Sequence, residues 1–71
     1  MAVCTSAQHN LIRVLMRELE LPIDRISVMH RTVFFDAGIP WNEGREVCAE
    51  VSALTTRQAS ALIRQLKARN E

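Results

Sequence analysis

The side chains in this chain that are suited to acid–base or metal chemistry are four carboxylates in its middle. Glu43, Glu46 and Glu50 have the spacing i, i+3, i+7, so they line one face if their segment is helical, and Asp36 lies nearby. Such a group can hold a metal ion or exchange protons with a substrate. The same pattern is typical of a solvated acidic face, which is the interpretation that we favour.

Zinc ligands are present but scattered. The candidates are Cys4, His9, His30 and Cys48, and no two of them have the close spacing of a zinc site. Cys48 equally suits a small core residue, and in a reducing cytosol both cysteines are expected to be free thiols. No Ser/His/Asp constellation or H-E-x-x-H motif occurs, and two glycines in the whole chain exclude a glycine-rich phosphate loop. We predict that the protein is not an enzyme and uses no metal or cofactor.

Basic residues gather toward the end of the chain. Residues 36–50 hold four carboxylates against one arginine, whereas residues 51–71 hold four cations against one glutamate. If the first and last predicted helices pack together, two arginines of the first helix extend this basic surface. The predicted phosphate-binding residues are Arg13, Arg17, Arg64, Lys67 and Arg69. Cations near a helix C-terminus also interact favourably with the helix dipole, so a purely structural role stays open.

A loop in the middle of the chain is the other candidate contact. Trp41 is the only tryptophan and follows Ile39 and Pro40 in the stretch with the least helical character. Because tryptophan is enriched at interface hot spots, we predict a partner-binding site at Ile39, Trp41 and Glu43. The alternative is that Trp41 folds back over a small core. The acidic middle and basic end also leave a homodimer or head-to-tail self-association open.

Two capped amphipathic helices are predicted at the ends of the chain. Thr5 with Gln8, and Thr55 with Gln58, have the spacing of a capping box. The last helix, over residues 55–70, has an apolar stripe of Ala59, Leu62, Ile63 and Leu66. The first helix, to about residue 20, has a stripe of Leu11, Ile12, Leu15 and Leu19, widened by Val14 and Met16.

The middle elements are shorter. A helical period after Pro22 predicts a second helix over residues 23–37, with Gly38 as a left-handed cap, although Thr32–Phe35 has high β-propensity. Residues 45–52 fit a short third helix or a strand. The expected fold is one all-α domain over residues 1–71, a bundle of three to four short helices. Its first and last helices pack together, and residues 1–4 form a loose N-terminus.

The two terminal helices together resemble a small helical module of phage and prophage proteins, often found at the C-terminus of recombination, single-strand annealing or other DNA-processing proteins. The matching residues of the first helix are Thr5, Gln8, Leu11 or Ile12, Leu15 and Leu19. Those near the last helix are Leu54, Thr55, Gln58, Ala59, Ser60, Leu62, Ile63 and Leu66. The middle, FFDAGIPWNEGREVC, does not match. The resemblance implies a phage or mobile-element setting and an accessory role, and it assigns no catalytic residue.

These observations predict a non-catalytic interaction module that acts through protein–protein contacts. The alternative is a nucleic-acid-binding accessory protein that uses the basic residues of the terminal helices. No apolar run approaches the roughly 18 residues of a membrane span. The first residues lack the features of a secretory signal, so we expect a cytoplasmic protein.

Overall fold

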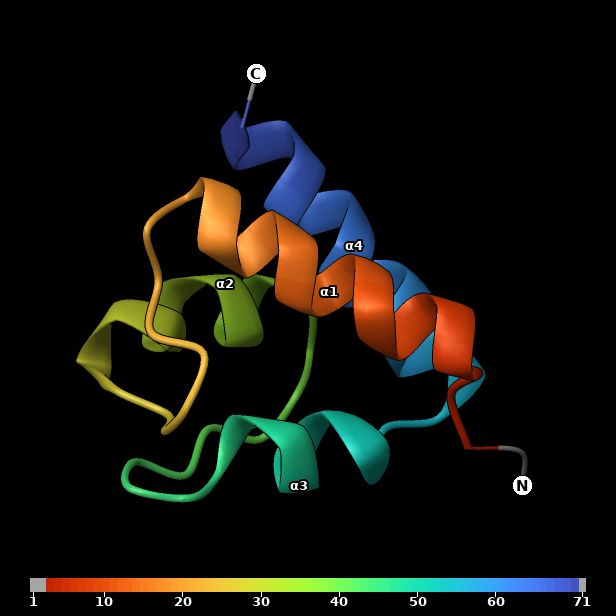
Figure 1. Cartoon of the computed structure of the whole chain (residues 1–71), viewed down its shortest axis with the longest axis horizontal. Helices are drawn as coiled ribbons and strands as arrows, with labels where there is room; N and C mark the ends of the chain where they lie inside the picture. Colours follow the sequence, from red (N-terminus) through yellow and green to blue (C-terminus); the bar gives the residue numbers. More distant parts are fainter. Residues whose placement is uncertain (1–2, 71) are drawn as a thin grey trace.

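The two terminal helices lie side by side and begin at the same end of the molecule (Figure 1). The computed structural model describes residues 3–70, apart from the side chain of Asn70, and places α1 at Ser6–Glu18 and α4 at Thr56–Asn70. Between them lie the 3₁₀ turn η1 (Val28–His30), α2 (Arg31–Asp36) and α3 (Val47–Ser52). The prediction of an all-α fold whose first and last helices pack together is confirmed.

Both predicted capping boxes form. The Gln8 N–H donates to Thr5 Oγ1 at 3.1 Å, and the Thr5 N–H donates to Gln8 Oε1 at 3.0 Å. Thr55 and Gln58 repeat the arrangement at 3.1 and 3.0 Å. Each box satisfies two backbone N–H groups that the start of a helix leaves without a helical acceptor. Local chemistry therefore sets where α1 and α4 begin.

The Gln8 side chain also joins the two helices. Its Nε2 donates to the backbone oxygen of Thr56 at 3.2 Å and to Ser60 Oγ at 3.1 Å. Because both acceptors lie in the first turns of α4, the helices start together and run in roughly the same direction before they diverge (Figure 1). One amide thus caps one helix and fixes its neighbour.

The segment before α1 pairs with the segment before α4. Val3 forms an antiparallel bridge with Thr55, and the Cys4 N–H donates to Leu54 O at 2.8 Å. Of the four residues expected to be loose, Val3 and Cys4 are therefore paired with the segment before α4. Met1 and Ala2 lie outside the described residues.

The apolar stripe of α4 enters the core as predicted, with Ile63 half-buried at its edge. In α1 the buried face is turned relative to the prediction, because Leu11 and Val14 are exposed. The residues of α1 that are buried are Ile12, Leu15 and Met16. Together with the half-buried Leu19 they have the spacing i, i+3, i+4, i+7, so the helix still presents one continuous face. The rest of the core comes mainly from the middle of the chain, with Phe34 its largest fully buried side chain.

The prediction of one helix over residues 23–37 is wrong for residues 23–27, which form a bend and an isolated β-bridge, and correct for the end of the segment. Val33 and Phe34 of α2 are buried, and Gly38 follows the helix in a left-handed conformation with φ +73°, as predicted for a C-terminal cap. The helical period therefore identifies the buried residues but overestimates the length of the helix.

Backbone hydrogen bonds explain why residues 23–27 are not helical. The Ile26 N–H donates to Arg45 O at 2.7 Å, and Ile26 O accepts from the Gly44 N–H at 2.8 Å. The Val47 N–H donates to Asp24 O at 3.0 Å. These backbone N–H and C=O groups find hydrogen-bond partners in a distant segment of the chain. They therefore do not need the i to i−4 hydrogen bonds of a helix.

Residues 45–52, for which the sequence allowed either a short helix or a strand, contain an isolated β-bridge followed by a short helix. Glu46 forms an isolated antiparallel bridge with Arg25, and α3 starts directly after it. Val47 and Val51 of α3 are fully buried. Within residues 3–70, no helix is both long and apolar enough to span a membrane.

Removing one cap hydroxyl tests this account. We expect Thr55→Ala to lower the free energy of unfolding by about 1 kcal/mol, because the Gln58 N–H loses its acceptor. For a domain of this size, that corresponds to a fall in Tm of roughly 4–8 °C, measured by circular dichroism. The matched control is Thr56→Ala, whose side chain makes no hydrogen bond within residues 3–70. An equal loss in both variants would contradict the capping role.

Candidate functional site

Only three of the five cations predicted to bind phosphate are exposed and without an ion-pair partner. Arg69 Nη2 lies 2.7 Å from Asp36 Oδ2, so an acidic neighbour already balances its charge. Arg13 is half-buried, and its Nε is enclosed without a hydrogen-bond partner. Arg17, Arg64 and Lys67 are exposed and form no ion pair with any residue that the structure describes. The packing of α1 against α4 brings together the two helices that carry them.

The three residues predicted to bind a partner do not form one exposed surface. Trp41 is half-buried against the core, and its Nε1–H donates to Ser27 O at 2.9 Å. The guanidinium of Arg31 lies 5.7 Å from the centroid of the tryptophan ring. Ile39 is buried in the core, whereas Glu43 is exposed. Trp41 therefore holds Ser27, the N-cap of η1, in place.

His30 is fully buried and uses both ring nitrogens. The Ser27 N–H donates to Nδ1 at 2.9 Å, and Nε2 lies 2.9 Å from Pro22 O. Because a backbone N–H needs a lone pair on Nδ1, we assign the proton to Nε2 and treat the ring as neutral. His30 thus ties the non-helical segment to η1, and neither nitrogen is left to bind a metal ion.

The four carboxylates of the middle segment do not share one helix face. Glu43 and Glu46 precede α3, so the arrangement predicted for a helical segment does not form, and Asp36 pairs with Arg69. The thiols of Cys4 and Cys48 are free. Among residues 3–70, no three side chains of the types that bind metals gather closely enough to hold an ion.

The largest exposed apolar side chain is Phe35, which the sequence analysis did not select. Phe35 is 80% exposed, whereas the adjacent Phe34 is 1% exposed. In η1, Val28 is 62% and Met29 54% exposed. The exposed residues of η1 and α2 other than Asp36, which pairs with Arg69, make up what we term the Phe35 face; its members are Val28, Met29, Arg31, Thr32 and Phe35. Arg31, Thr32 and Phe35 line one shallow hollow in it.

Helix geometry contains the signal that identifies this face. Successive residues of a helix point about 100° apart, so a buried face that contains His30, Val33 and Phe34 does not extend to Phe35. Phe34 continues the buried positions Ile26, His30 and Val33, which leaves Phe35 on the outer side. The period of the sequence therefore predicts one exposed phenylalanine, although the sequence alone does not show whether another element covers it.

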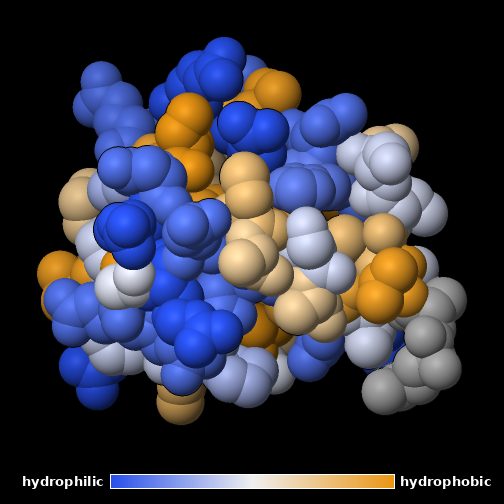
Figure 2. Space-filling model, turned by 60° about the horizontal axis from the view of Figure 1, so that its bottom comes forward, coloured by the Kyte–Doolittle hydropathy of each residue, from blue (hydrophilic) through white to orange (hydrophobic). Residues whose placement is uncertain are grey.

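The α3 side of the molecule has a different character (Figure 2). Hydrophilic residues cover the left of this view, and weakly apolar to apolar residues extend across its middle and right. The exposed residues of α3 and the turn after it include Ala49 and Ala53, while the charged residues 43, 45 and 46 are exposed in the preceding loop. Between residues 40 and 55, no large apolar side chain is exposed.

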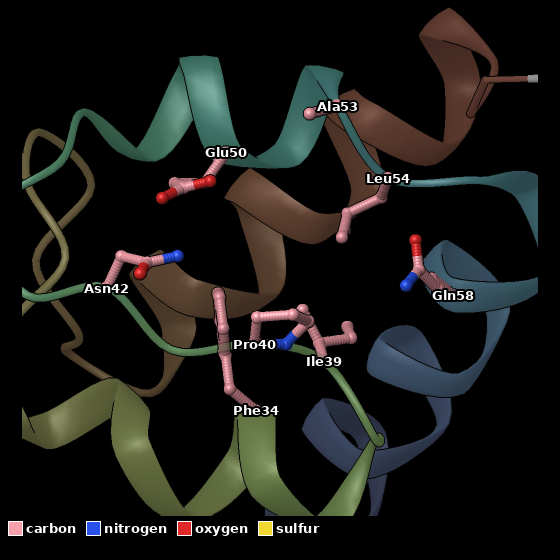
Figure 3. A pocket seen from close by; sticks show the side chains of 8 residues that line it. All are labelled: Phe34, Ile39, Pro40, Asn42, Glu50, Ala53, Leu54 and Gln58. Carbon is pink, nitrogen blue, oxygen red and sulfur yellow. The ribbon is translucent and has the colours of Figure 1, made fainter.

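A pocket of about 200 Å³ lies between α2, α3, α4 and the loop after Gly38 (Figure 3). Its apolar walls include Phe34, Ile39 and Leu54. Three polar side chains from different segments also line it, and these are Asn42, Glu50 and Gln58. The pocket therefore combines a carboxylate, two amides and apolar walls within one small space.

Comparison with protein families, curated proteins and solved structures identifies no relative: no family model, curated protein or solved structure matches the chain significantly. The functional interpretation therefore depends on the residues, contacts and surfaces described above.

Trp41→Phe separates a structural role from a direct partner contact. The substitution keeps an aromatic ring but removes the indole N–H that donates to Ser27 O, which then accepts only the His30 N–H at 3.1 Å. We therefore expect the free energy of unfolding to fall by about 1 kcal/mol. Urea unfolding followed by circular dichroism measures the change. Asn42→Ala is the control, because the Asn42 side chain forms no hydrogen bond within residues 3–70. Unchanged stability in Trp41→Phe would contradict the supporting role.

Proposed function

We propose that the protein is a non-catalytic interaction module that acts through protein–protein contacts, and that the Phe35 face is its contact surface. The observation that carries the proposal is the 80% exposure of Phe35 in α2, together with the exposure of Val28 and Met29 in the adjoining turn η1. Single exposed apolar residues are common on protein surfaces, whereas a contiguous group is typical of an interaction site. Val28, Thr32 and Phe35 have the spacing i, i+4, i+7, which supports a continuous face across η1 and α2.

The charge of this face supports a partner that carries carboxylates. Arg31 is exposed, lies over the Trp41 ring and forms no ion pair with any described residue. Asp36, the carboxylate at the end of α2, is already paired with Arg69. The face thus presents apolar surface beside an unbalanced positive charge. Its complement is a protein segment with an apolar anchor next to acidic residues.

The same charge disfavours a second copy of this chain as the partner. A two-fold dimer through the Phe35 face places the same patch on both sides of the interface. The two Arg31 side chains then share an interface to which the face contributes no free carboxylate, and like charges across an interface oppose association. A homodimer through this face is therefore the competing outcome of the test.

The resemblance of the terminal helices to modules of phage proteins adds a setting to the proposal. Those helices direct most of their apolar residues into the core, with Leu11 and Val14 as exceptions, so in this fold they serve as the support of the Phe35 face. We include a phage or mobile-element context and an accessory role in the proposal on the strength of this resemblance.

Substitution of the central residue tests the proposal. We expect Phe35→Ser to change the free energy of unfolding by less than about 0.5 kcal/mol, because the side chain is exposed. Peptides selected from a displayed random library against the wild-type protein should pair an apolar residue with an acidic one. They should bind Phe35→Ser at least about tenfold more weakly, since truncating an anchor costs 2 kcal/mol or more. Affinities are measured by fluorescence polarisation.

The matched control is Val14→Ser, which removes an exposed apolar side chain from α1 and should leave peptide affinity unchanged. Peptides that bind Phe35→Ser as tightly as the wild type would refute the assignment of this face. A dimer mass by light scattering that Phe35→Ser abolishes would replace the acidic partner with a second copy.

Nucleic-acid binding is the alternative, supported by Arg17, Arg64 and Lys67, which are exposed and form no ion pair with another residue of the described range 3–70. Under our proposal, the protein binds single- and double-stranded DNA more weakly than in the low-micromolar range, through non-specific attraction between its cations and the phosphates alone. If all three residues met phosphates of a duplex, log K would fall with log salt with a slope of about −2.7. A salt titration with wild type and Arg64→Gln distinguishes the two functions, because the alternative requires low-micromolar binding and a shallower slope in the variant.

A further inference from the structure

The pocket between α2, α3 and α4 contains a carboxylate oxygen that lacks a hydrogen-bond donor. The side chain of Glu50, in the first turn of α3, is 19% exposed, and its Oε1 is enclosed without a hydrogen-bond partner. The nearest cation is Arg45, whose Nε lies 3.7 Å away, which is longer than a hydrogen bond. An enclosed carboxylate oxygen is costly unless a donor reaches it, so the carboxylate of Glu50 is incompletely satisfied within the residues that the structure describes.

Arg45 is poorly placed to supply that donor. Its side chain is 69% exposed, so the ion pair with Glu50 is loose and solvent competes for it. The charge of Glu50 is therefore only partly balanced within the residues that the structure describes.

The opposite side of the pocket offers a donor of fixed orientation. Gln58 Oε1 accepts the Thr55 N–H at 3.0 Å as part of the capping box, which determines which end of the amide is the nitrogen. Gln58 Nε2 makes no hydrogen bond within residues 3–70, and the amide lies across the pocket from Glu50 (Figure 3). A ligand that reaches from Glu50 to Gln58 thus meets an acceptor at one end and a donor at the other.

The space between these two side chains is apolar and small. Phe34, Ile39 and Leu54 form its walls, and its volume of about 200 Å³ is below the roughly 300–1,000 Å³ of pockets for drug-sized ligands. A short alkyl chain fits such walls. An ammonium group is a compact charge with three donors, which suits a carboxylate that is only partly open to the pocket, whereas a guanidinium pairs best with both oxygens of a carboxylate.

We propose that this pocket binds a protonated primary amine on a short alkyl stem, with the ammonium group on Glu50 and the stem against Phe34, Ile39 and Leu54. The same chemistry is available as a free alkylamine or as a lysine side chain of another protein. The pocket shares no residue with the Phe35 face. An experiment that disproves amine binding in the pocket therefore leaves the proposed contact surface unaffected, and the reverse also holds.

A titration with n-butylammonium at pH 7, followed by ¹H–¹⁵N NMR, tests the proposal. We expect saturable shifts at the Ala53 amide and the Gln58 side-chain amide, with a Kd in the millimolar range suited to so small a ligand. The neutral control, n-butanol, has the same length and should bind at least about tenfold more weakly, because it lacks the charge-assisted hydrogen bond to Glu50. The second probe is Nα-acetyl-lysine amide, in which the side-chain amine is free. Tighter binding of this probe than of n-butylammonium identifies a protein lysine as the source.

Three variants sharpen the test. Glu50→Gln should weaken n-butylammonium binding about tenfold or more, and Arg45→Gln should tighten it by up to about fivefold, because it removes the competing cation. Ala53→Leu, which retains Glu50 but narrows the pocket, should weaken binding without the loss of charge. Unfolding curves establish that each variant is folded. Equal binding of n-butanol and n-butylammonium, equal affinity in Glu50→Gln, or shifts that do not saturate would overturn the proposal.

Discussion

The structure depends on the place where α1 and α4 begin together. Gln8 caps α1 through its Oε1 and reaches the first turns of α4 through its Nε2. The paired segments before the two helices reinforce this contact, because the Cys4 N–H donates to Leu54 O. With both starts fixed, the apolar faces of the two helices are held against one another and against the middle of the chain. Hydrogen bonds set the register of the helix pair, and burial of apolar surface supplies most of its stability.

The middle of the chain is held by a second set of polar contacts. His30 connects Pro22 to Ser27, and Trp41 binds the carbonyl of the same serine. These contacts fix η1, which leads directly into α2 and so determines which of the two phenylalanines enters the core. The exposure of Phe35 is thus a consequence of how His30 and Trp41 orient this segment. The proposed contact surface is built on side chains that do not themselves belong to it.

What the sequence could predict is what local chemistry determines. The Thr-x-x-Gln boxes act over three residues, so their position and geometry follow from the sequence, as does the stripe of α4. The non-helical residues 23–27 could not be predicted, because the partners of Ile26 lie at Gly44 and Arg45. The direction of Trp41 depends equally on a distant carbonyl. The pocket was also inaccessible to sequence reasoning, since four separate segments meet in it.

The pairing of α1 with α4 has a consequence for how the chain acquires its structure. The hydrogen bonds between Gln8 and α4 join residues 48 and 52 positions apart, although the fold is entirely helical in its regular elements. Contacts of such long range raise the contact order, and closing the loop between them costs entropy before any burial compensates for it. The chain should therefore fold more slowly than an up-and-down bundle of equal length. During synthesis, residues 19–55 must all follow α1 before α4, the helix that packs along it, begins to be made.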